Sequence, residues 1–226
     1  MVHSAMINRQ LTTLNCILSM VQPQSRFLHP DTIHPKLHLL EQLFPVIKKE
    51  YNAVKNKIEF RDFTSYQEQT IGNDGQGYEI NHQSFYTASV LNNDSKWGLA
   101  PLYYQGIAYT PNTIHMPKTC RILQEIEALT YSGFCILSPS ASLGWHHDPE
   151  PASGITNVRV QLPIESNGDS ILELENDSCT QIEGKLCCFT SSSVHRVVNQ
   201  GNAHRISLIL DYWRKDSQQT RIIESQ

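Results

Sequence analysis

The amino-acid sequence predicts a mainly β protein with helices near its N-terminus, and three features lead to this expectation. From Gly133 onward, short apolar runs alternate with Ser, Asn, Gly and Asp clusters, at the spacing of a β-sandwich or barrel. Between Asp31 and Asn56, apolar residues recur at helical spacing. The content of 39% hydrophobic and 18% charged residues is typical of a folded globular chain. The expected architecture is of jelly-roll or cupin type.

Two segments carry the signals of helices. Residues 31–56, DTIHPKLHLLEQLFPVIKKEYNAVKN, offer Asp31 or Thr32 as N-cap, and Pro45 is expected to kink or divide the helix. His34 and His38 stand four apart, as on one helix face, but without a carboxylate partner they indicate solvent-facing histidines rather than a metal site. A second helix begins with Pro117 in its first turn. Residues 66–115, rich in polar and aromatic residues, predict loops and short strands.

Six apolar runs predict the strands of the C-terminal half. They are GFCILSP (133–139), NVRVQLPI (157–164), SILELE (170–175), KLCCFT (185–190), HRVVNQ (195–200) and RISLILDYW (205–213). The turns SNGDS and NQGNA place Gly168 and Gly201 where a positive φ is expected. A chain of 226 residues suffices for one domain with a sizeable core. We therefore expect an N-terminal extension over 1–30 and a single domain over 31–226, with its β core at about 130–214.

Charge and composition argue against several classes of function. The 18 Lys and Arg residues are scattered and the net charge is −4, so no basic surface for nucleic acid is expected. Residues 11–21, LTTLNCILSMV, are too short and too polar to span a membrane, and with one preceding arginine they make a poor signal peptide. The six cysteines include no C-x-x-C, which indicates free, mostly buried thiols. We expect a cytoplasmic protein without a membrane partner.

Three potential metal ligands stand in the order H-x-D and then a distant H. His146 and Asp148 flank His147, and His195 follows 47 residues after Asp148. This is the linear form of the two-histidine, one-carboxylate set that binds Fe(II) on one face and leaves coordination positions open. Each residue alone is more often a loop histidine or a turn aspartate, and H-x-D by itself is a weak signal. Their order within a β-rich half favours the metal site.

Arg205 follows His195 by ten residues. If the chain turns at residues 199–202, the next strand returns Arg205 close to the metal site. We expect its side chain to point into a barrel that is otherwise lined by Ile206, Leu208 and Leu210. A guanidinium group is costly to bury there without an anionic partner, and the distal carboxylate of 2-oxoglutarate is a suitable one.

Three stretches of the chain resemble the aspartyl/asparaginyl β-hydroxylase family, whose members are Fe(II)- and 2-oxoglutarate-dependent dioxygenases with a double-stranded β-helix. They are FCILSPSASLGWHHD (134–148), GKLCCFTSSSVHRVVNQGNAHRISLILDYW (184–213), and WGLAPLYYQG (97–106) with MPKTC (116–120). The resemblance covers about residues 35–214. It implies metal binding by His146 and His195, 2-oxoglutarate binding by Arg205, and a helping role for Cys135 at the position of a family serine.

The resemblance leaves two registers open at the metal site. Alignment without gaps makes His146 the first ligand, whereas a register matched on Trp145 makes His147 the ligand. Alternation of side chains along a strand favours His146, because residues 146 and 148 then face the same way. Animal members have glycine where this chain has Asp148, so a complete triad is our expectation. Two departures from the family mean that the identity of the substrate cannot be carried over: the loop after the metal site is longer by about six residues, and Gln161 stands at the position of a family arginine.

The function that these observations predict is hydroxylation of an aliphatic carbon by a dioxygenase that uses Fe(II), 2-oxoglutarate and O2. The expected substrate is an amino acid, an amino-acid residue, a small peptide or a related natural product. Arg159, Gln105 and His147 are candidates for holding its carboxylate or amide. The alternative is a non-catalytic cupin-like protein that binds a metal or a ligand. Asp148 argues against halogenation, which needs a vacant position instead of the carboxylate.

Overall fold

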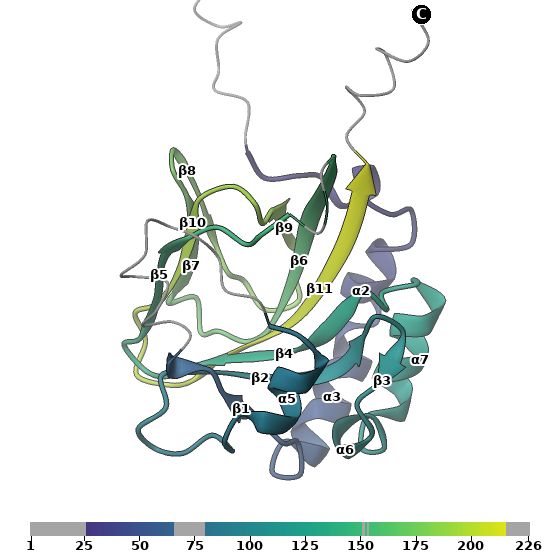
Figure 1. Ribbon diagram of the computed structural model, residues 1–226, viewed down its shortest axis with the longest axis vertical. Coiled ribbons are helices and arrows are strands. Elements are labelled where there is room, and N and C mark those ends of the chain that lie inside the picture. Colours follow the sequence, from purple (N-terminus) through teal and green to yellow (C-terminus); the bar gives the residue numbers. More distant parts are fainter. Residues whose placement is uncertain (1–25, 66–79, 151, 153, 216–226) are drawn as a thin grey trace, which may run out of the picture.

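The computed structural model describes residues 26–65, 80–150, 152 and 154–215, which form two antiparallel sheets and a layer of helices (Figure 1). The helical elements are η1 (Pro30–Thr32), α2 (His38–Gln42), α3 (Phe44–Val54), α5 (His82–Thr87), α6 (Thr110–Thr113) and α7 (Pro117–Glu125). The strands are β1 (Arg61–Asp62), β2 (Trp97–Tyr104), β3 (Ile107–Ala108), β4 (Tyr131–Leu137), β5 (Ser142–His146), β6 (Ile155–Glu165), β7 (Ser170–Leu174), β8 (Asp177–Thr180), β9 (Cys187–Thr190), β10 (His195–Asn199) and β11 (Arg205–Lys215).

The order of the strands is that of a jelly roll. The larger sheet runs β1-β2-β4-β11-β6-β9 with β3 beside β2, and the smaller sheet runs β5-β10-β7-β8. Going along the chain from β4, the strands cross repeatedly between the sheets, so that β4, β11, β6 and β9 face β5, β10, β7 and β8. This arrangement is a double-stranded β-helix. The fold class predicted from the sequence is confirmed.

Alternation of side chains along β11 divides the apolar core into two parts. Ile206, Leu208 and Leu210 belong to the cluster between the larger sheet and the helices, whereas Ile209 belongs to the cluster between the two sheets. Because neighbouring residues of a strand face opposite sides, Arg205 shares the inward face with Ile209. The expectation that Ile206, Leu208 and Leu210 line the barrel is therefore wrong.

Helices α2, α3 and α7 cover the outer face of the larger sheet (Figure 1). Leu40 of α2, Ile47 of α3 and Leu123 of α7 are fully buried against it. The Tyr51 ring of α3 packs on Phe134 of β4, with 5.1 Å between the ring centroids. This layer protects one face of the sheet from water, which leaves the inner face, between the two sheets, to form the site.

The helical segment near the N-terminus differs in part from the prediction. The helix is divided as expected, since α2 ends at Gln42 and α3 carries Pro45 in its first turn. Asp31, however, lies within the separate turn η1 and caps no long helix. His34 lies outside α2, so His34 and His38 do not share a helix face; the His34 ring stacks instead on Tyr212, with 5.8 Å between the centroids.

The larger sheet extends beyond the expected core at 130–214. Strand β2, whose eight residues are almost all buried, pairs with β4, and β1 pairs with β2. Because core clusters cover both of its faces, β2 lacks the alternating pattern that reveals a half-buried strand. Pro101, beside a register shift in the pairing with β4, further masks it in the sequence. Residues 66–79 of the expected loop region lie outside the described part.

Of the two predicted glycine turns, only one has the expected backbone. Gly168 adopts a φ of 76°, but Gly201 is not among the glycines with positive φ. At that turn the Asn199 side chain donates to the carbonyl of Ala203 at 2.8 Å, while its oxygen accepts from the Gly201 N–H at 3.2 Å. Hydrogen bonds of the Asn199 side chain thus hold this turn, and Gly201 does not have the positive φ that was expected there.

The remaining expectations from composition are tested only in part. Cys120, Cys135, Cys179, Cys187 and Cys188 are free thiols, and all but Cys179 are buried, as predicted. Cys16 and the apolar stretch 11–21, with most of the expected N-terminal extension, lie outside the described residues. In the part of the chain that the structure describes, every helix is too short or too polar to span a lipid bilayer.

Candidate metal centre and adjoining cavities

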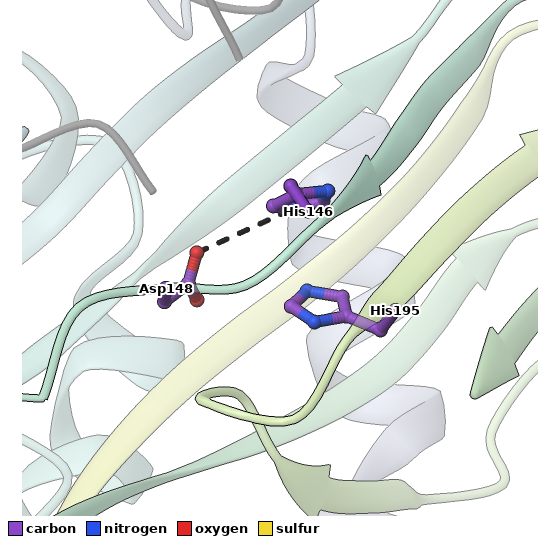
Figure 2. A group of neighbouring side chains, drawn as sticks. All are labelled: His146, Asp148 and His195. Carbon is purple, nitrogen blue, oxygen red and sulfur yellow. Dashed lines mark ion pairs between the residues drawn. The ribbon is translucent and has the colours of Figure 1, made fainter. Parts of the chain in front are cut away.

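His146, Asp148 and His195 come together at one end of the smaller sheet (Figure 2). His146 ends β5 and His195 begins β10, and the antiparallel register places them opposite each other, with 4.2 Å between the ring centroids. The Asp148 N–H donates to the Ser191 carbonyl at 2.9 Å, which turns the carboxylate toward the histidines. Their potential ligand atoms all lie within 4.8 Å of one another. His147 is not part of this group.

Backbone carbonyls select the histidine tautomers. Nδ1 of His146 lies 2.6 Å from the Gly144 carbonyl oxygen, and Nδ1 of His195 lies 2.8 Å from that of Ser193. A carbonyl oxygen can only accept, so each Nδ1 carries the proton and each Nε2 keeps a lone pair. Burial lowers the pKa of His146, and burial together with the neighbouring His146 lowers the pKa of His195 to about 3. Both rings are therefore neutral at pH 7, the form that binds metals.

Asp148 is held as a carboxylate by the positive charge of Arg159. Its Oδ2 atom lies 2.7 Å from an Arg159 terminal nitrogen, whereas Oδ1 lies 4.0 Å from Nε2 of His146. Burial raises the pKa of Asp148, but Arg159 and the two histidines outweigh it, and the pKa is below its ordinary value. One oxygen thus faces the arginine and the other is directed toward the histidine pair.

Arg159 is paired a second time, on the side away from Asp148. Its Nε and a terminal nitrogen each donate to one oxygen of Asp211, both at 2.9 Å. The two residues face each other across the β6–β11 pair, which fixes this fork geometry. The guanidinium group therefore links a candidate metal ligand to β11 in the larger sheet. One terminal nitrogen contacts Asp148, and Nε with the other terminal nitrogen contacts Asp211.

Arg205 is buried among neutral groups. It is 1% exposed, its Nε donates to Gln181 at 2.7 Å, and a terminal nitrogen donates to Gln161 at 2.6 Å. Within the described residues, no carboxylate forms an ion pair with it. The Cys135 thiol, which accepts from the Trp97 indole at 3.1 Å, lines the same small cavity as Arg205. A buried cation without a counter-charge is costly, and an anion bound beside it would offset that cost.

Two cavities adjoin these groups. The smaller, of about 30 Å³, lies beside Arg205 and Cys135; the larger, of about 580 Å³, includes Asp148 and Arg159 in its wall. Trp97 and Ile209 line both cavities, so the two spaces share a wall. The residues that line the larger cavity are Ile80, Phe85, Trp97, Leu99, Tyr104, Gln105, Thr130, Tyr131, Asp148, Pro149, Glu150, Asn157, Arg159, Ile209, Asp211 and Trp213.

The candidate substrate residues fall in different places. Gln105, with a φ of 49°, lines the larger cavity from the turn after β2. Arg159 lines it too, but its guanidinium group is held by Asp148 and Asp211. His147 is half-buried and is not among the residues that line the cavity.

Sequence reasoning assigned no role to Asp211 or Gln181, which contact Arg159 and Arg205 respectively. For Asp211 a signal was present, because it lies six residues after Arg205 in one strand and must face the same way. Gln181 directly follows the edge strand β8, and nothing in its local sequence indicates that its side chain enters the core.

Comparisons with known proteins agree on one family. The model of the family described as aspartyl/asparaginyl beta-hydroxylase matches residues 41–215. An ornithine lipid ester-linked acyl 2-hydroxylase of Rhizobium tropici is 25% identical over 124 residues, 54% of this chain and 43% of that protein. The chain therefore spans less than half the length of this curated relative.

Two solved structures match parts of the chain with low TM-scores. An oxidoreductase of the 2OG-Fe(II) oxygenase family from Burkholderia pseudomallei has a TM-score of 0.39 at 10% identity, covering 54% of this chain and 70% of that chain. A predicted oxalate decarboxylase from Thermotoga maritima has a TM-score of 0.33 at 17% identity, covering 52% and 81%.

Proposed function

Because the chain belongs to the aspartyl/asparaginyl β-hydroxylase family, we propose that it is an Fe(II)- and 2-oxoglutarate-dependent dioxygenase that hydroxylates an aliphatic carbon. One observation carries the proposal: His146, Asp148 and His195, in their metal-binding forms, come together at one site, and the cavity at Asp148 shares Trp97 and Ile209 with the cavity beside the buried Arg205 guanidinium group, which has no counter-charge. The range of substrates expected from the sequence, from free amino acids to small natural products, stays a prediction.

The donor set suits Fe(II). Two neutral imidazole nitrogens and one carboxylate oxygen, all within 4.8 Å of one another, form the two-histidine, one-carboxylate set that leaves coordination positions open. When bound, Fe(II) with 2-oxoglutarate and O2 supplies the oxidising power that converts a C–H bond to C–OH, with succinate and CO2 as the other products. The hydrogen bonds that the two Nδ1–H groups donate to the Gly144 and Ser193 carbonyls hold the rings in orientation.

Arg205 would hold the distal carboxylate of 2-oxoglutarate. Its inward position, its burial and the lack of a described anionic partner support this role. The cavity beside it has room for about one water molecule, so 2-oxoglutarate requires a movement of neighbouring side chains. We propose that the Gln161 and Gln181 side chains, which accept hydrogen bonds from Arg205, give way to the carboxylate; Cys135, which lines the same cavity, offers only a weak hydrogen-bonding group.

Arg159 is better suited to position Asp148 than to bind the substrate. A substrate carboxylate would have to displace either Asp148 or Asp211 from the guanidinium group, at distances of 2.7 and 2.9 Å. With Arg159 in place, Oδ2 of Asp148 is occupied and Oδ1 is left for the metal. We assign Arg159 as a positioning residue.

The proposal is tested by adding Fe(II) and 2-oxoglutarate to the protein without oxygen. We expect a weak visible charge-transfer band that is lost in His195→Ala, and succinate release once oxygen and a suitable substrate are added. The alternative, a cupin-like protein that binds a metal or ligand without turnover, predicts neither signal. Absence of both the band and succinate across a substrate panel would favour that binder.

A further inference from the structure

Asp148 lies in a loop, unlike the two histidines of the candidate metal centre (Figure 2). His146 ends β5 and His195 begins β10, so the hydrogen-bond ladders of the smaller sheet fix the backbone of both. Asp148 follows the end of β5 by two residues and belongs to no strand. The position of its carboxylate therefore depends on contacts outside the two sheets.

Asp148 is held at its side chain and at its backbone, and both contacts lead to strand β6. The carboxylate pairs with Arg159 of β6 at 2.7 Å. The backbone N–H donates to the carbonyl of Ser191, in the loop between β9 and β10, at 2.9 Å. Ser191 is bound in turn to Asn157, which precedes Arg159 by two residues and lies on the same face of β6. One strand thus reaches Asp148 by two routes.

The link between Asn157 and Ser191 is buried and consists of more than one hydrogen bond. The Ser191 N–H donates to the Asn157 carbonyl at 2.9 Å, and Nδ2 of Asn157 donates to the Ser191 hydroxyl oxygen, also at 2.9 Å. Ser191 is fully buried and Asn157 is 6% exposed, so the low local dielectric strengthens both bonds. The ladder between β6 and β9 ends one residue earlier, at Val158 and Thr190. The Asn157 amide therefore extends the attachment of the loop beyond the end of the sheet.

The Asn157 side chain adds little to the stability of the fold. Its Oδ1 atom is buried and forms no hydrogen bond with any described residue. A buried acceptor without a partner is costly, and this cost offsets the gain from the Nδ2 bond. The side chain is better explained by what it positions than by the stability it provides.

From these contacts we propose that Asn157 is a positioning residue of the metal centre, which acts through Ser191 to hold Asp148 where its carboxylate can bind the metal. This inference rests on the proposed function, in which Asp148 is a metal ligand. Arg159 and Asn157 then have separate tasks. Arg159 orients the carboxylate group, whereas Asn157 fixes the backbone from which that group extends.

A double-variant comparison of metal affinity tests the proposal. The dissociation constant for Fe(II) is measured anaerobically on the full chain with Asn157→Ala, with Asp148→Ala and with both. We expect Asn157→Ala alone to weaken binding about tenfold, and to have no further effect in the Asp148→Ala chain, because it acts only through that carboxylate. Undiminished affinity in Asn157→Ala, or a tenfold loss that persists in the Asp148→Ala chain, would overturn the inference.

Two serine variants separate positioning from general damage to the fold. Ser191→Ala removes the other end of the same hydrogen bond, so it should weaken Fe(II) binding by a similar factor. Ser166→Ala is the matched control, because its buried hydroxyl donates to the Gln181 carbonyl at 2.6 Å beyond the opposite end of β6. This control should bind Fe(II) as the wild type does. Equal losses in Ser166→Ala and Asn157→Ala would contradict a specific role for Asn157.

The visible spectrum of bound Co(II), which reports the ligands around the ion, gives a second readout. Asn157→Ala should move this spectrum toward that of Asp148→Ala, and Ser166→Ala should leave it unchanged. A wild-type chain that binds Co(II) with the same spectrum and affinity as Asn157→Ala would remove the positioning role alone. A wild-type chain that binds neither Fe(II) nor Co(II) would overturn the proposed function as well.

Discussion

Replacing Arg159 with methionine separates the two roles considered for this residue. If Arg159 serves only to bind the substrate, the metal-free protein should be as stable as the wild type. If it is the shared partner of Asp148 and Asp211, its loss leaves two carboxylates near each other without a counter-charge, and the folded state should suffer.

The size of the effect follows from burial. Removing one partner of a buried ion pair costs about 3–5 kcal/mol of the free energy of unfolding. The Arg159 side chain is 19% exposed, and those of Asp148 and Asp211 are 18% and 10% exposed. Solvent screening reduces the expected loss to about 2–3 kcal/mol, or about 5–10 °C in Tm. A divalent metal supplies positive charge to Asp148, so it should stabilise Arg159→Met by more than it stabilises the wild type.

The assay is urea unfolding with and without saturating Mn(II). Arg196→Met is the matched control, because Arg196 pairs with Glu173 at a surface where it is 38% exposed, and its loss should cost under about 1 kcal/mol. Adding Asp211→Asn to Arg159→Met should recover part of the lost stability. An unchanged urea midpoint for Arg159→Met, or equal stabilisation by metal in variant and wild type, would refute the reasoning.

Three further predictions concern the buried groups. Arg205→Met should leave the metal-free protein at least as stable as the wild type, because it removes a buried cation that has no counter-charge. The same substitution should abolish the rise in Tm that 2-oxoglutarate produces. A rise of equal size in the variant would remove the role assigned to Arg205. The pKa of His195 is about 3 in the folded protein and 6.5 in the unfolded chain, so the unfolded chain takes up the proton first as the pH falls. The free energy of unfolding of the metal-free protein should be at its full value above pH 6.5 and about 2 kcal/mol lower at pH 5. Thermal melts measure this slope, which His195→Asn should flatten. Gly133→Ala should lower stability by about 1–3 kcal/mol, because the added carbon would lie 2.6 Å from the Ala100 carbonyl oxygen; an unchanged Tm would contradict this packing.

The sequence predicted β6, β10 and β11 but not β5, the short strand that ends at His146, and it did not reveal which faces the predicted strands present. Runs such as RISLILDYW indicated β11, but an apolar residue at nearly every position hides which side is inward. The structure shows that Ile206 and Leu208 face the helices, while Arg205 and Ile209 face the smaller sheet. A strand buried on both faces carries no alternating pattern, and only tertiary packing assigns its sides.

The ligand group could be found in the sequence because its spacing is partly local. His146 and Asp148 are two residues apart, and a turn and one strand separate His195 from Arg205. Ion pairs between strands leave no such trace. The link from Asp148 through Arg159 to Asp211 joins a loop, β6 and β11, and only the β6–β11 register brings its members together.

The dissociation constant for Fe(II), measured anaerobically on single alanine variants, tests the central claim most directly. We predict that His146→Ala, Asp148→Ala and His195→Ala each weaken binding by more than about a hundredfold, because each removes one ligand, whereas His147→Ala changes it by less than about twofold. A loss for His147→Ala as large as that for His146→Ala, or an undiminished affinity in any of the three ligand variants, would contradict the account.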